Sequence, residues 1–169
     1  GKLFESFQAS AGQLGEAQSG RQKVIGLKSL EQMGFNFENT DAGKDFKNKI
    51  MQEAFRAQAP LGLSALGMSQ KNIETIKESG FNQEIAKSII KSMDSKQSDL
   101  MAQIIDAANL DKLAKSERDY KTKLLQAEQT ARRAMVEAIG GNIDATYDLI
   151  DSNFALIGSN INVMKSHGS

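Results

Sequence analysis

The fold is decided by the stretch AMVEAIGGNIDATYDLI, residues 134–150, in which two helix-forming segments meet at Gly140-Gly141. Glycine readily adopts the left-handed conformation that ends a helix, and Asn142 is a good N-cap for the next one. We therefore expect the chain to turn back on itself here and to form a long antiparallel helical hairpin over residues 110–165. The alternative is one continuous helix, which would cost roughly 1 kcal/mol for each glycine relative to alanine.

Small and apolar residues recur on each arm at steps of three and four, which is the spacing of a coiled-coil-like packing face. When the chain is folded at the glycines, these faces stay in register, and small side chains oppose large ones, as dense packing requires. The expected layers pair Ala138 with Ile143, Ala134 with Tyr147, Ala131 with Ile150, Ala127 with Phe154, Leu124 with Ile157 and Tyr120 with Ile161.

Apolar residues outside these layers indicate that the hairpin needs a further helix. On the second arm Leu149, Leu156 and Val163 repeat every seven residues, and on the first arm Met135 and Ile139 lie beside the packing face. A third helix, from the same chain or from a neighbouring subunit, should cover them.

The N-terminal segment, residues 1–35, is expected to be a loosely ordered helix that orders against the rest of the chain or another subunit. Four glycines weaken it as an isolated helix. They are Gly12, Gly15, Gly20 and Gly26. The sequence Met33-Gly34-Phe35 fits the glycine-containing Schellman ending of a helix.

Residues 36–109 are expected to form a smaller bundle of short helices, while residues 166–169 form a tail after the hairpin. Helix starts are predicted at Thr40 or Asp41, at Ser69 and at Asn82, because these residue types are good N-caps. Pro60 is predicted to stop the first of these helices. The apolar run 61–68 is then either a buried connector or a loop that touches a membrane or docks a subunit.

Composition supports an all-α globular protein and narrows its chemistry. The chain has 169 residues, of which 40% are hydrophobic and 25% charged, and its 21 basic residues balance its 21 acidic ones. The net charge therefore gives no indication of a nucleic-acid partner. Cysteine is absent, which excludes disulfides, thiol nucleophiles and cysteine-bound zinc. No apolar run approaches the roughly 18 residues of a membrane-spanning helix.

We identify no catalytic, cofactor-binding or metal-binding residue and expect a non-enzymatic protein. His167 is the only histidine, which leaves no partner for a histidine triad or a multi-histidine metal site. Asp144, Asp148 and Asp151 lie on one side of the last helix and are interpreted as a solvated face. No glycine-rich phosphate-binding motif is present.

One segment, residues 70–108, resembles a ubiquitin-associated three-helix module. That family carries a Met-Gly-Phe/Tyr loop after its first helix and small and aliphatic residues in its second. The matching residues are Gly80 and Phe81 in the loop and Ala86 and Ile90 in the helix, while Ser79 replaces the usual methionine. The resemblance implies a protein-binding module.

The favoured function is a helical structural or interaction protein, a component of a larger assembly such as a secretion apparatus, a pilus or a virus particle. The expected partners are protein subunits or further copies of the chain, and not nucleic acid, and an exported or virion-associated location is slightly favoured. The alternatives are the protein-binding module of residues 70–108 and a membrane-active helical protein. The candidate partner-binding residues are Leu61, Leu63, Leu66, Met68, Phe81, Leu149, Leu156 and Val163.

Overall fold

The computed structural model describes residues 11–139 and 153–157, with side chains for residues 16–137 and 153–157. Every regular element in this part of the chain is helical, which confirms the all-α class. The α-helices are α2 (Ala11–Gln32), α3 (Asp41–Ala65), α4 (Gln70–Glu78), α5 (Gln83–Met93), α6 (Ser98–Ala107) and α7 (Tyr120–Ile139). Three short 3-10 turns are η1 (Phe37–Asn39), η2 (Leu110–Lys112) and η3 (Lys115–Glu117).

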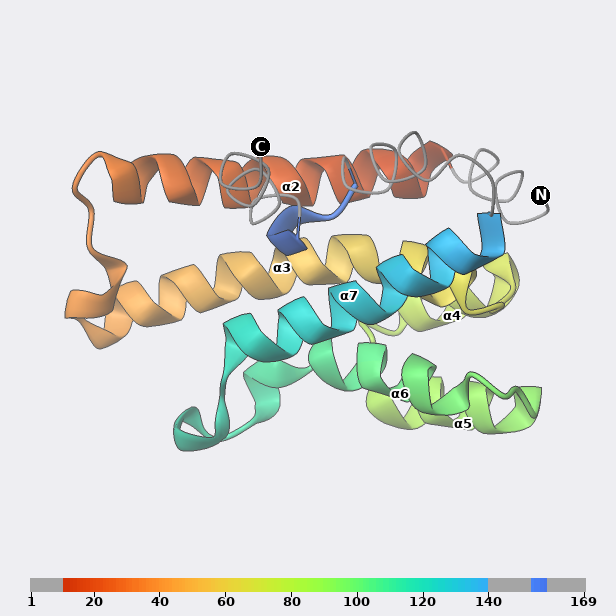
Figure 1. Ribbon diagram of the computed structural model, residues 1–169. Helices are drawn as coiled ribbons and strands as arrows, with labels where there is room; N and C mark the ends of the chain where they lie inside the picture. The colour runs from red at the N-terminus through yellow and green to blue at the C-terminus, as the bar shows by residue number, and fades with distance from the viewer. Residues whose placement is uncertain (1–10, 140–152, 158–169) are drawn as a thin grey trace.

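Helix α3 is the centre of the fold. It packs against α2 on one side and against α7 on another, and its contacts with α6 and α4 are less extensive (Figure 1). Helices α5 and α6 pair with each other, and α6 also contacts α7. The buried apolar residues of all these helices belong to one cluster, which extends from Ala17 in α2 to Ile157.

The predicted helix starts are confirmed at α3, α4 and α5. The side chains of Thr40, Ser69 and Asn82 each accept a hydrogen bond from the backbone N–H three residues later, at 3.0, 3.3 and 3.0 Å. Each bond satisfies one of the N–H groups that a helix start leaves without a partner inside the helix.

The predicted end of α2 is also confirmed. Gly34 has a φ of +103°, which places it in the left-handed region. The N–H of Phe35 donates to the carbonyl of Leu30, and the N–H of Gly34 donates to that of Glu31, both at 3.1 Å. This is the Schellman pattern, and it repeats at Gly80, after α4.

Helix α2 orders against the same chain, because its packing face lies along α3 (Figure 1). Ala17, Val24 and Leu27 are buried there. Gly20 allows a close approach of the two helices, since a Cβ atom at this position would lie 3.0 Å from the carbonyl oxygen of Ala54. One of the glycines that weakens α2 in isolation therefore allows it to pack on α3.

The prediction that Pro60 ends its helix is wrong, because α3 continues through Pro60 to Ala65. A proline inside a helix costs about 3 kcal/mol or more through its missing N–H and its clash with the preceding turn. Here Pro60 is buried, and Leu61 and Leu63, which follow it, are part of the core. Burying side chains of this size contributes about 1.5–3 kcal/mol each, which offsets the cost of the proline.

The first arm of the predicted hairpin is shorter than expected. Helix α7 begins at Tyr120, and residues 110–112 and 115–117 form the 3-10 turns η2 and η3 instead of α-helix. Leu110 is drawn into the core, and the side chain of Asp119 accepts the N–H of Thr122 at 3.4 Å at the start of α7. The spacing of residues 110–119 predicted an α-helix, but Leu110 is buried from a 3-10 turn instead.

The second arm is not one uninterrupted helix, because residue 153 lies in a turn and a helical turn begins at residue 155. Phe154 and Ile157 are buried, as are their expected partners Ala127 and Leu124. The layers that involve residues 138, 143–150 and 161 lie outside the residues whose side chains are described. Met135, one of the residues expected to need cover from a third helix, is fully buried, and α7 packs on both α3 and α6.

None of the helices in the described ranges combines the length and the apolar character that a membrane crossing requires.

Candidate functional site

A buried carboxylate, that of Glu128 in the middle of α7, holds the described C-terminal segment in place. Its side chain is fully buried, and its two oxygen atoms accept the backbone N–H groups of Leu156, at 3.5 Å, and Ile157, at 2.9 Å. These N–H groups belong to the helical turn that begins at residue 155, and the first N–H groups of a helix have no carbonyl partner inside it.

Gln58 of α3 completes this arrangement from the other side. Its Oε1 atom accepts the N–H of Ala155 at 2.8 Å, while its Nε2 atom donates to the carbonyl of Ala54 at 2.9 Å. Gln58 is fully buried as well. We call Gln58 and Glu128 the polar clamp, because together they bind three successive N–H groups and fix residues 155–157 on the core.

Burial changes the acidity of the clamp. Desolvation is the dominant effect and raises the pKa of Glu128 from 4.5 to about 8, although the hydrogen bonds from Ile157 and Leu156 favour the charged form and act in the opposite direction. Near neutral pH the carboxyl is therefore largely protonated, and it can still accept the two N–H groups through its remaining lone pairs.

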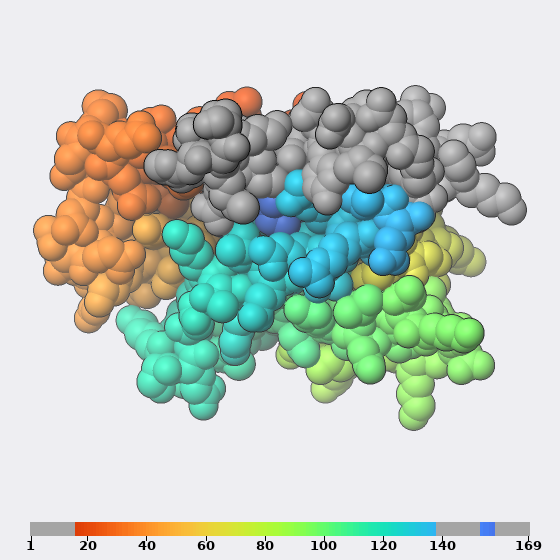
Figure 2. Space-filling model, in the orientation of Figure 1, coloured from red at the N-terminus to blue at the C-terminus, as the bar shows by residue number. Residues whose placement is uncertain are grey.

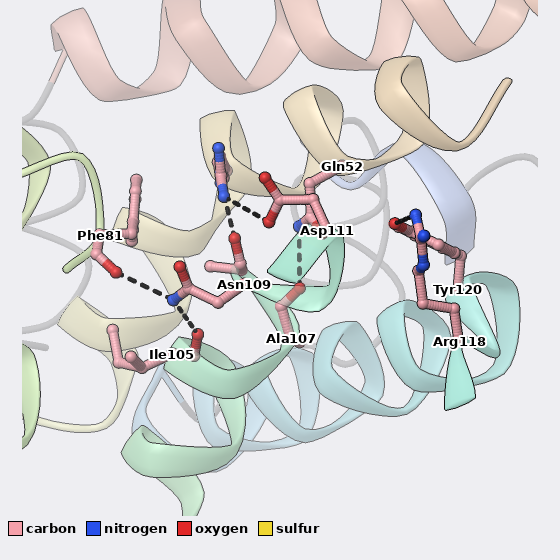
Figure 3. Close-up of polar contacts among 10 residues, drawn as sticks. Gln52, Phe81, Ile105, Ala107, Asn109, Asp111, Arg118 and Tyr120 are labelled. Carbon is pink, nitrogen blue, oxygen red and sulfur yellow. Dashed lines mark hydrogen bonds and ion pairs between the residues drawn. The ribbon is translucent and has the colours of Figure 1, made fainter. Parts of the chain in front are cut away.

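A second polar network joins α3 to the end of α6 (Figure 3). Gln52 donates to the carbonyl of Ala107 at 2.8 Å, and Arg56 donates to the carbonyl of Ala108 at 2.6 Å and to Asp111 at 2.9 Å. These bonds satisfy carbonyl groups at the end of α6, where helical partners run out. The network therefore holds the end of α6 on α3, which is a structural role.

Asn109 extends this network to the loop after α4. Its buried amide donates to the carbonyls of Phe81, at 2.9 Å, and Ile105, at 2.8 Å (Figure 3). Phe81 has a φ of +57°, an uncommon conformation for a bulky residue. The Asn109 amide supports this strained turn from the neighbouring element.

Exposed apolar side chains gather at one end of the molecule, where α2 turns into α3. We call the segment from Leu30 to Phe46 the α2–α3 tip. Met33 is 76% exposed, Phe35 60% and Phe46 50%, and Leu30 lies at the same end. In Figure 2 this orange part of the chain forms one extremity of the molecule. Of the large apolar side chains exposed in the described ranges, those outside the tip are Ile25 and Ile85.

Three aromatic rings give the tip a defined shape. Phe37 lies between Phe35 and Phe46, with ring centroids at 6.2 and 5.7 Å and interplanar angles of 22° and 25°. Such stacked pairs contribute about 0.5–1.5 kcal/mol beyond the area they bury. Lys47 forms ion pairs with Glu31 and Glu38 beside the rings. The tip is thus an ordered apolar platform with a charged border.

The structure places most of the sequence-predicted partner residues inside the core. Those in the described ranges are all at most 7% exposed, so their apolar side chains pack within the chain itself. They are Leu61, Leu63, Leu66, Met68, Phe81 and Leu156. Leu149 and Val163 lie outside the described residues. The run 61–68 is accordingly the last turn of α3 and the turn after it, and this agrees with the buried-connector interpretation.

Sequence reasoning missed both the polar clamp and the tip. A signal for the clamp exists, because Leu124, Glu128, Ala131 and Met135 are spaced by four, three and four residues and share one face of α7. A carboxylate within an otherwise apolar stripe is a candidate for burial. The sequence signal for the tip is weaker. It consists of three phenylalanines that follow the helix-ending Gly34, and the same pattern would fit a turn whose aromatic rings are buried.

Among the described residues, no group of three metal-ligating side chains lies close enough together to hold a metal ion. No protein-family model matches the sequence, and comparisons with curated proteins and with solved structures return no match.

Proposed function

We propose that the protein is a non-enzymatic helical subunit of a larger assembly and that the α2–α3 tip is the surface with which it docks on neighbouring copies of the chain. The observation that carries this proposal is the exposure of Met33, Phe35 and Phe46 within one short segment, where Phe35 and Phe46 both stack on Phe37. Methionine and aromatic residues are enriched at protein interfaces, and contiguous exposed apolar patches mark interaction sites.

The charges around the tip favour a protein partner over a membrane surface. Glu38 lies in η1 and Asp41 at the start of α3, and both are exposed. Acidic groups are repelled by the anionic lipids of a bilayer surface, whereas a polar, charged rim around an apolar centre is the usual anatomy of a protein interface. The helical, cysteine-free composition is typical of subunits of secretion machines, pili and virus particles, and an exported or virion-associated location accords with this proposal.

Light scattering of the full chain over a wide concentration range tests the proposal. We expect the average mass of the native protein to rise with concentration, and a Met33→Ser, Phe35→Ser double variant to stay monomeric. An Ile85→Ser variant is the matched control, because Ile85 is 42% exposed on α5, away from the tip. A native protein that remains monomeric, or a double variant that associates as strongly as the control, would overturn the proposal.

A second candidate function is the protein-binding module of residues 70–108. The observation that favours it is that helices α4, α5 and α6 form in this segment, with the Gly80-Phe81 turn after the first of them. Phe81 itself is buried, so a partner would have to contact exposed residues of the segment, such as Ile85. Titration of the full chain with ubiquitin, followed by NMR, tests this function: shifts confined to the segment support it, and unchanged spectra exclude it.

A further inference from the structure

A cavity of about 280 Å³ lies between α2, α3, α7 and the segment held by the polar clamp. Its apolar wall comes from side chains of all four elements, namely Val24, Leu27, Met51, Leu125 and Leu156. This space is many times what a single water molecule requires, so it can hold a small organic ligand. The wall contains no aromatic ring, so it offers no platform for stacking a nucleobase.

Three ammonium groups from three different helices line the same cavity. They belong to Lys28 of α2, Lys47 of α3 and Lys121 of α7, and Glu31 is the one carboxylate among the lining residues that the structure describes. Lys47 is already paired with Glu31, at 3.3 Å, and with Glu38, at 3.5 Å. Among the described residues, none forms an ion pair with Lys28 or Lys121. The cavity therefore has unbalanced positive charge beside an apolar wall.

The acidity of Lys28 agrees with this imbalance. Its pKa is lowered, first by partial burial and then by the neighbouring ammonium group of Lys121, with a smaller effect of the same sign from Lys47. Glu31 acts in the opposite direction but does not restore the ordinary value. An anion placed between Lys28 and Lys121 would relieve this repulsion and would be held by charge-assisted hydrogen bonds.

We propose that this cavity is a binding site for a small amphiphilic carboxylate, such as a short-chain or medium-chain fatty acid. The carboxylate lies between the ammonium groups of Lys28 and Lys121, and the alkyl chain lies against Val24, Leu27 and Met51. Ligand sites commonly combine a mostly apolar lining with a few polar groups that fix orientation. The cavity borders the α2–α3 tip, whose residues Glu31 and Gln32 also line it, but Lys28 and Lys121 lie outside the exposed apolar platform of the tip.

Calorimetric titration of the full chain with octanoate tests the proposal, because octanoate has an eight-carbon chain and one carboxylate. We expect one molecule to bind per chain and the melting temperature to rise with octanoate concentration. Octanol, which lacks the charge, and octylammonium, which reverses it, should bind at least tenfold more weakly. Absence of octanoate binding, or equal affinity for octanol, would overturn the proposal.

Variants of the two free lysines separate this site from general hydrophobic binding. Lys28→Met and Lys121→Met keep the apolar stems and remove the charges, and each should weaken octanoate binding tenfold or more. Lys91→Met, on the exposed surface of α5, is the matched control and should leave binding unchanged. Equal binding by all three variants would contradict the assignment.

Two further arms address folding and an alternative source of the anion. The double variant Lys28→Glu, Lys121→Glu should prefer octylammonium to octanoate, and this gain of binding requires a folded cavity. Retained preference for octanoate would refute the assignment. Vesicles containing phosphatidylglycerol present their anions at a lipid surface, and binding to these vesicles without binding of free octanoate would show that the lysines serve a membrane surface and not the cavity.

Discussion

Protonation of Glu128 should make the stability of this protein depend on pH in an uncommon direction. The pKa of its carboxyl is about 8 in the folded protein and 4.5 in the unfolded chain. Between these values the folded state holds a proton that the unfolded state has released, so the free energy of unfolding falls as pH rises. Linkage sets the slope at about 1.4 kcal/mol per pH unit, or about 3 kcal/mol between pH 5 and pH 7. The loss begins near pH 4.5 and is complete above the folded pKa.

Urea unfolding followed by circular dichroism, at several pH values from 5 to 9, measures this dependence. Glu128→Gln is the reference variant, because it keeps the shape of the side chain and one of its two oxygen acceptors but cannot ionise. The lost acceptor lowers stability by an amount that does not depend on pH. The difference in unfolding free energy between native protein and variant should shift by about 1.4 kcal/mol per unit until about pH 8 and then level off. Parallel pH profiles for the two proteins would refute the reasoning about the buried carboxyl.

Three further predictions concern packing and the clamp, each measured by urea unfolding. Gly62→Ala should lower stability by about 1–3 kcal/mol, because the new Cβ would lie 2.8 Å from the Cβ of Ala131, whereas Gly26→Ala, with open space around it, should raise stability by up to about 1 kcal/mol. Ala131→Leu should lower stability by about 1–3 kcal/mol, because the larger side chain overpacks the contact between α3 and α7. A neutral result would mean that the two helices are not closely packed there. Gln58→Ala should cost about 1–3 kcal/mol by leaving the buried N–H of Ala155 without an acceptor, and unchanged stability would contradict that hydrogen bond.

Local chemistry made the helix boundaries near Thr40, Ser69 and Asn82 predictable from the sequence. Each depends on one side chain that bonds to the backbone three residues later, so neighbours in sequence determine the outcome. The glycine ending after α2 is local for the same reason. Tertiary packing decided the places where the prediction failed. Pro60 stays inside α3 because the residues beyond it are buried, and no local rule contains that information.

The candidate sites were harder to foresee than the helices. Glu128 resembles an ordinary helical carboxylate until its position between apolar neighbours on α7 is considered, and its partners lie 28 and 29 residues away. The tip and the cavity depend on which side chains the folded chain leaves exposed or brings together. Lys28 and Lys121 are far apart in sequence and meet only because α2 and α7 both border α3.

The central claim, that the α2–α3 tip docks on other copies of the chain, is tested most directly by photo-crosslinking from within the tip. A photoreactive phenylalanine analogue in place of Phe35 keeps an aromatic ring at this exposed position, and the same analogue at Ile85 provides the comparison. On illumination of the purified full chain, we predict covalent dimers from position 35, with crosslinked peptides that map to one surface of the neighbouring copy, and few from position 85. Equal yields from the two positions, or no dimers from position 35, would contradict the claim.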